Sequence, residues 1–197
     1  MIIPNNMISH VGKIFQGEYA IGQMTNPYII DIGANVGGFA IWAHEYFPNA
    51  KIDCYEPIKA NYELLRQNTE GTDIAIRNIA IGKEDGERKM YYGANNCGEA
   101  SLYQGHEQSN DGELVKMMSS MHLPKCDIMK IDTEGAEIEI LENLVNFPSV
   151  FLIEFHSAYN RRRIDELLID YTLIECTMRG WNYGILKYVR TEICTQN

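Results

Sequence analysis

The 197-residue sequence lacks the features of a membrane-spanning, secreted or nucleic-acid-binding protein. No apolar run approaches the roughly 18 residues of a membrane span, and no basic segment followed by a long apolar stretch opens the chain, so we expect no secretory signal. Basic residues number 17 against 27 acidic ones, and this net charge of −10 argues against a broad phosphate-binding surface. We therefore expect a cytoplasmic protein with no membrane and no nucleic-acid partner.

Cysteine is also scarce. The chain has five, an odd number, and no two are close enough to form a CxxC pair. This spacing argues against a disulfide framework or a zinc cluster and fits a reducing compartment. The length fits one domain with a single core.

What the chain does contain is a regular alternation of apolar strands and amphipathic helices. Strands are predicted at 28–32, 51–56, 73–81, 126–132 and 150–156, and helices at 36–47, 57–68, 134–146 and 161–170. This order predicts an α/β fold with a mostly parallel sheet and helices on both faces. Residues 171–178 and 184–191 are two further strands without a helix between them, which predicts a C-terminal antiparallel hairpin. A Rossmann-like seven-stranded sheet of this kind is typical of class I methyltransferases.

The middle of the chain interrupts the alternation. We predict a turn and an extra strand at 82–93, an irregular loop at 94–105, and a short strand with a helical turn at 113–123. The expected organisation is a single domain over residues 1–197. It comprises an N-terminal helical segment, a core and a region beside the substrate, at 1–27, 28–190 and 93–125 respectively.

The segment "DIGANVGG" at 31–38 follows the first predicted strand. In open α/β sheets, ligands bind beyond the carboxyl ends of the strands where the strand order reverses. Gly33 and Gly37 would let the backbone approach such a ligand, and Gly38 would let the helix pack on the strand. Asn35 stands where a dinucleotide motif has its second glycine, and Asp31 would attract an ammonium or sulfonium group. The loop therefore predicts a site for S-adenosylmethionine rather than NAD, with a purely structural turn as the alternative.

Two later strand ends complete the predicted cofactor site. Glu56 could accept two hydrogen bonds from a ribose diol. Asn78 could bind the adenine edge, although an asparagine that stabilises a turn is nearly as plausible. The neighbouring Ala34, Pro57 and Ile79 are assigned to the same site.

Four motifs occur in a fixed order: "DIGANVGGFA", "YEPIKANYELLRQN", "NIAIG" and "MKIDTEGAEIEIL". Together they resemble the FkbM family of S-adenosylmethionine-dependent methyltransferases, which are mostly O-methyltransferases. The resemblance covers roughly residues 14–190 and is weakest over 93–125. It implies the class I fold, the cofactor and an O-methyl product, and it leaves the acceptor open.

A second group of polar residues ends the fourth and fifth predicted strands. Because side chains alternate along a strand, Lys130 and Asp132 share one face, and so do Glu154 and His156. We expect these four catalytic candidates to converge beside the methyl donor. His156 would act as general base, with Asp132 as its orienter or as an alternate base, and Lys130 would stabilise an alkoxide. A purely structural ion pair is the other interpretation.

A metal centre is a further alternative. Asp132, Glu154 and His156 offer oxygen and nitrogen ligands that suit Mg²⁺. The arginines at 161–163 are either a solvated surface run or a site for an anionic substrate.

Several neighbouring polar residues have simpler interpretations. Glu134 and Glu137 are expected to be helix-start acids. His10 and the other histidines show no partner spacing, and we expect them to be exposed or packed.

The leading functional prediction is O-methylation of a small-molecule or sugar hydroxyl with S-adenosylmethionine. The alternatives are methylation of RNA or protein, and a non-catalytic cofactor-binding protein on the same fold. Cover for the substrate is expected from residues 93–125, from residues 1–27 or from a partner subunit, which would make the protein a homo-oligomer.

Overall fold

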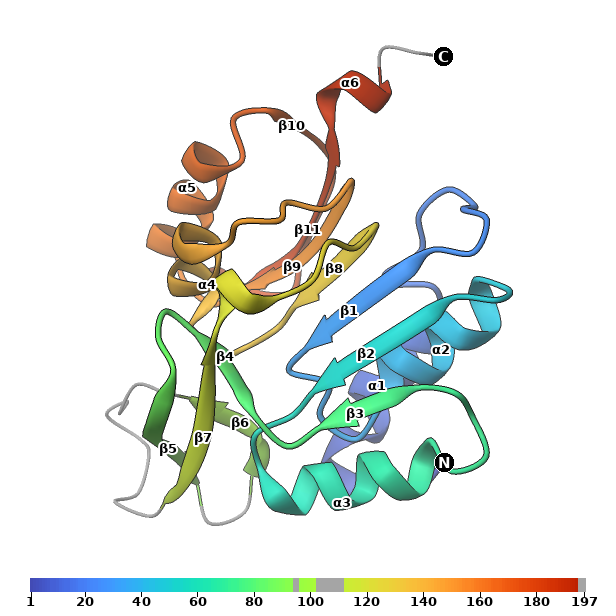
Figure 1. The fold of residues 1–197 in the computed structure, drawn as a ribbon, viewed down its shortest axis with the longest axis vertical. Helices are drawn as coiled ribbons and strands as arrows, with labels where there is room; N and C mark the ends of the chain where they lie inside the picture. Colours follow the sequence, from blue (N-terminus) through green and yellow to red (C-terminus); the bar gives the residue numbers. More distant parts are fainter. Residues whose placement is uncertain (94–95, 102–111, 195–197) are drawn as a thin grey trace.

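A seven-stranded sheet forms the centre of the computed structural model, which describes residues 1–93, 96–101 and 112–194 (Figure 1). Its strand order is β10-β11-β9-β8-β1-β2-β3. The bounds are β1 Tyr28–Ile32, β2 Lys51–Tyr55, β3 Ala75–Arg77, β8 Ile128–Ile131, β9 Val150–Phe155, β10 Tyr171–Met178 and β11 Gly184–Arg190. Neighbouring strands from β3 to β9 are parallel, whereas β11 pairs antiparallel with both β9 and β10. The predicted fold class, including its C-terminal hairpin, is confirmed.

Helices cover both faces of this sheet. One face carries α1 (Ile8–Phe15), α2 (Gly38–Tyr46) and α3 (Lys59–Asn68), and the other carries α4 (Glu137–Asn143) and α5 (Ala158–Leu167) (Figure 1). Alternate residues of β1 separate the two layers, because Ile29 packs with the first set and Ile30 with the second. A short helix η1 (Asn5–Met7) precedes α1, and α6 (Thr191–Cys194) follows β11. The predicted helical segment 1–27 is helical only over residues 5–15.

A four-stranded sheet of order β4-β7-β5-β6 lies beside the main one. Its strands are β4 Ala80–Gly82, β5 Gly86–Gly93, β6 Asn96–Ser101 and β7 Gly112–Ser119, and η2 (Ser120–His122) follows them. The extra strand after residue 82, and the strand and helical turn at 113–123, are confirmed. The irregular loop predicted at 94–105 is wrong for residues 96–101, which form β6, and its remaining residues lie outside the described part of the chain.

The single third strand predicted at 73–81 is also wrong. The chain leaves the main sheet after Arg77 and enters the second sheet at Ala80. Between them, the Asn78 side chain donates hydrogen bonds to the backbone oxygens of Glu56 and Pro57, at 2.9 and 2.8 Å. These bonds hold the crossing point against the end of β2. The apolar pattern continues across this point although the two halves belong to different sheets, with β3 partly exposed and β4 buried.

The helix starts differ from the predictions by about three residues. The helix expected from residue 134 begins at Glu137, because Glu134 and Gly135 have φ values of 53° and 117°. The helix expected from residue 161 begins at Ala158, where the Ser157 hydroxyl caps it by accepting a bond from the Asn160 N–H at 3.0 Å.

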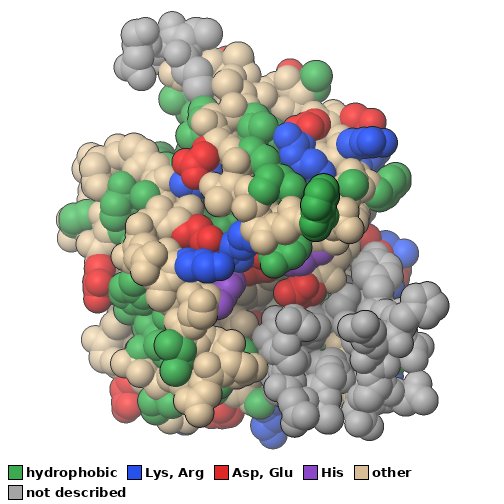
Figure 2. All heavy atoms as spheres, turned by 180° about the vertical axis from the view of Figure 1, so that it is seen from behind, with side chains coloured by type: hydrophobic (Ala, Val, Ile, Leu, Met, Phe, Trp, Pro, Cys, Tyr) green, Lys and Arg blue, Asp and Glu red, His purple; other side chains and the backbone are tan. Residues whose placement is uncertain are grey.

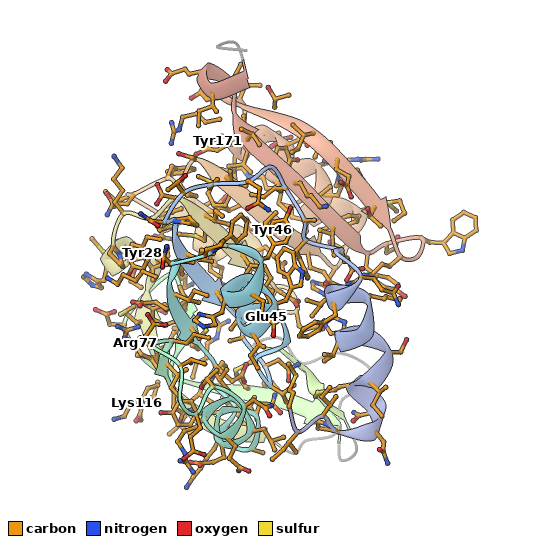
Figure 3. The ribbon with its side chains drawn as sticks, turned by 90° about the vertical axis from the view of Figure 1, so that its right-hand side faces the viewer. Tyr28, Glu45, Tyr46, Arg77, Lys116 and Tyr171 are labelled. Carbon is orange, nitrogen blue, oxygen red and sulfur yellow. The ribbon has the colours of Figure 1, made fainter. Side chains whose placement is uncertain are left out.

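Side-chain bonds fix the parallel strands next to β1. The Tyr28 hydroxyl and the Arg77 guanidinium both donate to Asp53, each at 2.9 Å, and so join β1, β2 and β3 (Figure 3). The carboxyl ends of β1, β2, β8 and β9 meet at one edge of the sheet. This edge is where ligands bind in open α/β folds.

Candidate functional site

The glycine loop after β1 is held against the carboxyl ends of β2 and β8. The backbone N–H groups of Gly33 and Ala34 both donate to the Tyr55 carbonyl at 3.0 Å. Gly33 has a φ of 78°, and a Cβ there would lie 1.8 Å from the Asp132 carbonyl oxygen. The protein's own backbone therefore already requires a glycine at this position, and the approach of a ligand to Gly33 stays a prediction.

The other two glycines of the loop also lie close to protein side chains. Gly37 has a φ of 90°, and a Cβ there would lie 2.8 Å from the Leu65 side chain. A Cβ on Gly38 would lie 3.2 Å from Ile14 of α1, so this glycine brings two helices together rather than a helix and a strand. These contacts set the path of the loop and leave its side toward β2 open.

A hollow of about 570 Å³, hereafter the loop hollow, opens beside this loop. Its wall includes Gly33, Asn35, Glu56, Pro57, Ile79 and Asp132. Six residues predicted for ligand contact or catalysis thus meet around one space, whose volume includes the part that is open to solvent. Ala34 borders a smaller gap between the loop and α1, and Gly37 borders none of the described hollows.

Glu56 is the buried carboxylate of the loop hollow. Its oxygens accept the backbone N–H groups of Asn35 at 2.8 Å and Ile58 at 2.9 Å. Burial raises the pKa of Glu56 to about 7, although these bonds and one to Asn61 oppose the shift. Each carboxylate oxygen can accept a second hydrogen bond, so the geometry is compatible with a diol at this position.

Two further residues predicted for the cofactor, besides Gly37, do not border the described hollows. The Asn78 amide is exposed and donates to the backbone as described above, so the turn-stabilising interpretation fits the structure better than adenine binding. Asp31 is fully buried, and its carboxylate lies 3.1 Å from the Lys130 ammonium. It is therefore not positioned to attract a ligand cation.

Lys130 connects the loop with the end of β8. Its ammonium lies 3.1 Å from Asp31 and 3.4 Å from Asp132, and it donates to the Gly33 carbonyl at 2.8 Å. Burial alone would lower its pKa, but the two carboxylates raise it above the ordinary value, so Lys130 remains charged. The geometry does not favour the predicted contact between Lys130 and an alkoxide, because the ammonium is paired with Asp31 and Asp132.

A second space, hereafter the helix hollow, lies beneath α1. Its wall includes His10 and Lys13 of α1, Glu154 and His156 at the end of β9, and Arg179 and Tyr183 between β10 and β11. Asn35, Asp132 and Glu134 border both this space and the loop hollow. Figure 2 shows acidic, basic and histidine side chains gathered at the centre of this face. The two hollows therefore meet at Asp132 and Glu134.

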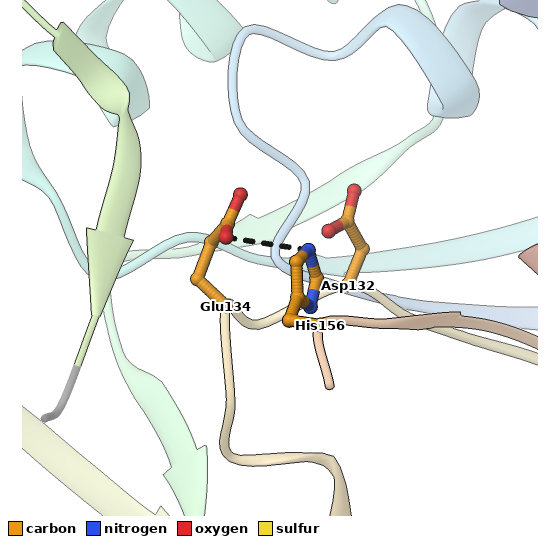
Figure 4. Close-up of side chains that lie close together, drawn as sticks. All are labelled: Asp132, Glu134 and His156. Atoms are coloured by element: carbon orange, nitrogen blue, oxygen red, sulfur yellow. Dashed lines mark ion pairs between the residues drawn. The ribbon is translucent and has the colours of Figure 1, made fainter. Parts of the chain in front are cut away.

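His156 is surrounded by carboxylates (Figure 4). Its Nδ1 lies 3.1 Å from buried Glu137, and its Nε2 lies 3.2 Å from Glu134 and 3.9 Å from Glu154. Burial would lower the pKa of His156, but Glu137, Glu134 and Asp132 together raise it to about 10. His156 is thus an imidazolium at neutral pH and is unsuited to the role of general base that its sequence position suggested.

The other carboxylates at this edge have contrasting environments. Burial raises the pKa of Glu134 to about 8 and that of Glu154 to about 7. The pKa of Asp132 is lowered, because the cations Lys130 and His156 outweigh the effect of its burial. Glu154 is held by Arg179, whose Nη1 donates to both carboxylate oxygens at 2.8 Å. Glu154 therefore anchors the turn between β10 and β11.

The possible metal ligands that the structure brings together differ by one residue from the set considered from sequence. Asp132, Glu134 and His156 have ligand atoms within 4.8 Å of one another, whereas Glu154 is bound to Arg179 (Figure 4). Both nitrogens of His156 face carboxylates, and Lys130 lies beside Asp132. The protein's own cations thus already compensate these carboxylates, and the geometry gives no support for Mg²⁺.

The arginines at 161–163 fit the simpler of their two interpretations. Arg161 pairs with Asp165, and Arg163 pairs with Glu142 and Glu166 at 2.9 Å. Neither borders a described hollow, so nothing in the structure supports substrate binding by this run.

Glu134 and His10 are among the residues of the helix hollow that sequence reasoning missed. Glu134 was interpreted as a helix-start acid, but the helix begins three residues later and Glu134 lies at the junction of the hollows. The "TEG" turn after a strand was the available signal. His10 had no signal, because α1 brings it to the site from a distant part of the sequence.

Solved structures show which fold this is. The precorrin-6y C5,15-methyltransferase of Geobacter metallireducens GS-15 superposes with a TM-score of 0.55 at 13% identity, over 96% of this chain and 94% of that one. The magnesium protoporphyrin IX methyltransferase (ChlM) of Synechocystis PCC 6803, solved with bound SAM, gives 0.54 at 11% identity, over 92% and 78%. The chain has the Rossmann-like methyltransferase fold.

The family is shown by sequence. The model of the family described as Vibrio cholerae RfbT protein matches residues 21–161, more than half of the chain. The chain belongs to this family. It is a different family from FkbM, and the FkbM resemblance stays a prediction.

Two curated relatives are similar over part of their length. Methyltransferase sdnD of Sordaria araneosa is 25% identical, and the match covers 61% of this chain and 61% of that protein. Hexuronic acid methyltransferase AglP of Haloferax volcanii is 24% identical, over 71% and 60%. The chain thus spans about three fifths of the length of these relatives. Within the described ranges, no helix has both the length and the apolar character needed to cross a membrane.

Proposed function

We propose that the protein is an S-adenosylmethionine-dependent methyltransferase. The observation that carries the proposal is the loop hollow, in which a glycine loop, a buried carboxylate at the end of β2 and an acid after β8 surround one space. Glu56 would accept the ribose hydroxyls, and Ile79 would contribute apolar contact from the β3–β4 crossing. The motifs that resemble the FkbM family lie on these same segments, and this location favours O-methylation, the reaction that the resemblance implies.

The chemistry follows from where the two hollows meet. When bound, S-adenosylmethionine supplies an electrophilic methyl group. Asp132 and Glu134 border both hollows and would orient an acceptor that enters from beneath α1. Lys130 and His156 would hold these carboxylates in place through their ion pairs. Positioning of this kind supplies much of the catalysis in a two-substrate displacement.

The proposed acceptor is a hydroxyl of a small molecule or sugar. The helix hollow is lined by polar and charged groups, which suits a hydrophilic acceptor better than an apolar one. The names of the relatives also favour this class, since one of them is a hexuronic acid methyltransferase. RNA or protein methylation is the alternative, because structures with this fold include a putative RNA methyltransferase and a ribosomal protein methylase.

Calorimetric titration with S-adenosylmethionine, S-adenosylhomocysteine and NAD tests the cofactor. We expect micromolar binding of the first two and none of NAD. A radiolabelled methyl-transfer assay with methyl glycosides of neutral sugars and of uronic acids then tests the acceptor, with tRNA and a protein mixture as the alternative substrates. If the protein binds none of these three compounds, the proposal is refuted and a non-catalytic protein on this fold is favoured.

A further inference from the structure

Helix α1 places a histidine in the helix hollow, opposite the acid that ends β8. His10 borders this hollow together with Asn35 and Asp132, and it also borders the smaller gap between α1 and the glycine loop with the same two residues. The buried residues Val11 and Ile14 hold α1 against the sheet layer below it. His10 is therefore a fixed part of the site although it lies far from the other site residues in the sequence.

The His10 ring differs from Lys130, Arg179 and His156, the less exposed basic groups around this hollow. Lys130 is paired with Asp132, Arg179 with Glu154, and both nitrogens of His156 face carboxylates. In contrast, no hydrogen bond or ion pair joins the His10 ring to any residue of the described ranges 1–93, 96–101 and 112–194. Its nitrogens are thus available to a molecule in the hollow.

We propose that His10 is the general base that accepts the proton of the acceptor hydroxyl. This inference rests on the proposed methyltransferase function. Each transfer forms one O–C bond and breaks one C–S bond, whose electron pair stays on sulfur, and it releases one proton from the acceptor oxygen. His10 takes that proton on a ring nitrogen and passes it to solvent after the product leaves. The nearby Asp132 stabilises the imidazolium that forms.

The charge environment of His10 is consistent with this role. The charged and titratable groups around it come from several elements: Lys13, Glu18, Lys130, Asp132, Glu134, Glu154, His156 and Arg179. Burial has the largest effect and lowers the pKa of His10 below 6.5, Asp132 opposes it, and Arg179 and Lys130 reinforce it. His10 is therefore neutral at pH 7, as a base must be, whereas His156 is charged.

His10→Gln tests the proposal in the full-length protein, with His44→Gln as the matched control. His44 is half-exposed on α2, pairs with Asp73 at 3.7 Å and lies outside both hollows. We expect His10→Gln to lower kcat by at least about 100-fold. The Kd for S-adenosylmethionine and the KM for the methyl glycoside acceptor should stay within about threefold of the wild-type values. The acidic limb of the kcat–pH profile should disappear in this variant. His44→Gln should keep the wild-type values.

A histidine titration by NMR supplies a readout that needs no acceptor. The resonance absent from His10→Gln, or from His10→Asn if the first variant does not fold, should titrate below pH 6.5. A midpoint above 7.5 would overturn the proposal, and so would an unchanged kcat. A loss of S-adenosylmethionine affinity that accounts for the whole loss of activity would instead make His10 a cofactor ligand. Failure of the wild-type protein to bind S-adenosylmethionine would refute the methyltransferase function itself, which is a separate result.

Discussion

Replacing Glu56 by glutamine tests the cofactor site at its most constrained residue. The Glu56 carboxylate is 4% exposed, and it accepts N–H bonds from Asn35 and Ile58 at 2.8 and 2.9 Å. Glutamine has nearly the same shape but only one acceptor oxygen. One of the two N–H groups would therefore face an amide NH₂. An unsatisfied buried group of this kind costs about 1–3 kcal/mol of folding free energy.

Glu56→Gln should also weaken cofactor binding, and this effect is measured separately from the loss of folding free energy. A hydrogen bond to a charged group contributes about 1.5–3 kcal/mol. At 1.4 kcal/mol for each tenfold change, Glu56→Gln should raise the Kd for S-adenosylmethionine about 10- to 150-fold. Calorimetric titration measures this value, and a thermal melt of the same sample measures the loss of stability.

The pH dependence of binding gives a second signature. Burial raises the pKa of Glu56 to about 7, and the ionised carboxylate is the better acceptor for ribose hydroxyls. Affinity for S-adenosylmethionine should therefore increase as the pH rises from 6 to 8. In Glu56→Gln this increase should be absent, because the variant has no carboxylate to ionise at that position.

Glu63→Gln is the matched control for both measurements. Glu63 lies on the exposed side of α3, where its side chain is 45% exposed and pairs with Arg66 at 3.0 Å. Exposed pairs contribute about 0–1 kcal/mol, so this variant should bind the cofactor like the wild type. A Glu56→Gln protein that melts cooperatively and keeps the wild-type Kd would refute the ribose-binding role.

Three further predictions concern the charges and glycines behind the site. Lys130→Met should lower the free energy of unfolding by about 3–5 kcal/mol, measured by urea titration, because it leaves the Asp31 carboxylate buried without its cation. Gly33→Ala should abolish cofactor binding and lower Tm, because the new Cβ would lie 1.8 Å from a carbonyl oxygen. Gly71→Ala is the control, because a Cβ there meets open space and adds only backbone strain of about 1–2 kcal/mol. His156→Gln should lose about 3 kcal/mol of stability at pH 7. Because folding raises the pKa of His156 from 6.5 to about 10, this difference from wild type should be complete below pH 6.5 and vanish as the pH rises through 10.

Each of these predictions has an outcome that would contradict it. Lys116 is exposed on β7, so Lys116→Met should be neutral, and a Lys130→Met protein as stable as Lys116→Met would refute the buried pair. Equal Tm values for Gly33→Ala and Gly71→Ala would show that the loop does not approach β8 so closely. A stability difference for His156→Gln that grows between pH 8 and 11 would show that His156 is neutral.

The sequence by itself determined the architecture and the position of the candidate site. The alternation of apolar and amphipathic segments has one favoured topology, because parallel strands need helical crossovers and a strand pair without a helix forms a hairpin. The same rule brings strand ends together at one edge. Gly33, Glu56 and Asp132 could therefore be assigned to one site although they lie on three different segments.

Local patterns could not determine where one sheet ends and another begins. Residues 73–81 show one continuous apolar pattern, yet Asn78 marks a crossing between two sheets. Periodicity indicates that a segment is a strand, but it does not specify which sheet the strand joins.

Only the tertiary structure decided the chemical state of the polar residues. Alternation along β8 and β9 placed Lys130 and His156 on the correct face, but a face does not specify which charge lies about 3 Å away. Lys130 is paired with Asp31 and Asp132. The carboxylates of Glu134, just before α4, and Glu137, at its start, hold His156 as a cation. His10 reaches the same hollow from α1, a contact that no spacing in the sequence reports, because its closeness to Asp132 arises from how a helix packs against a sheet.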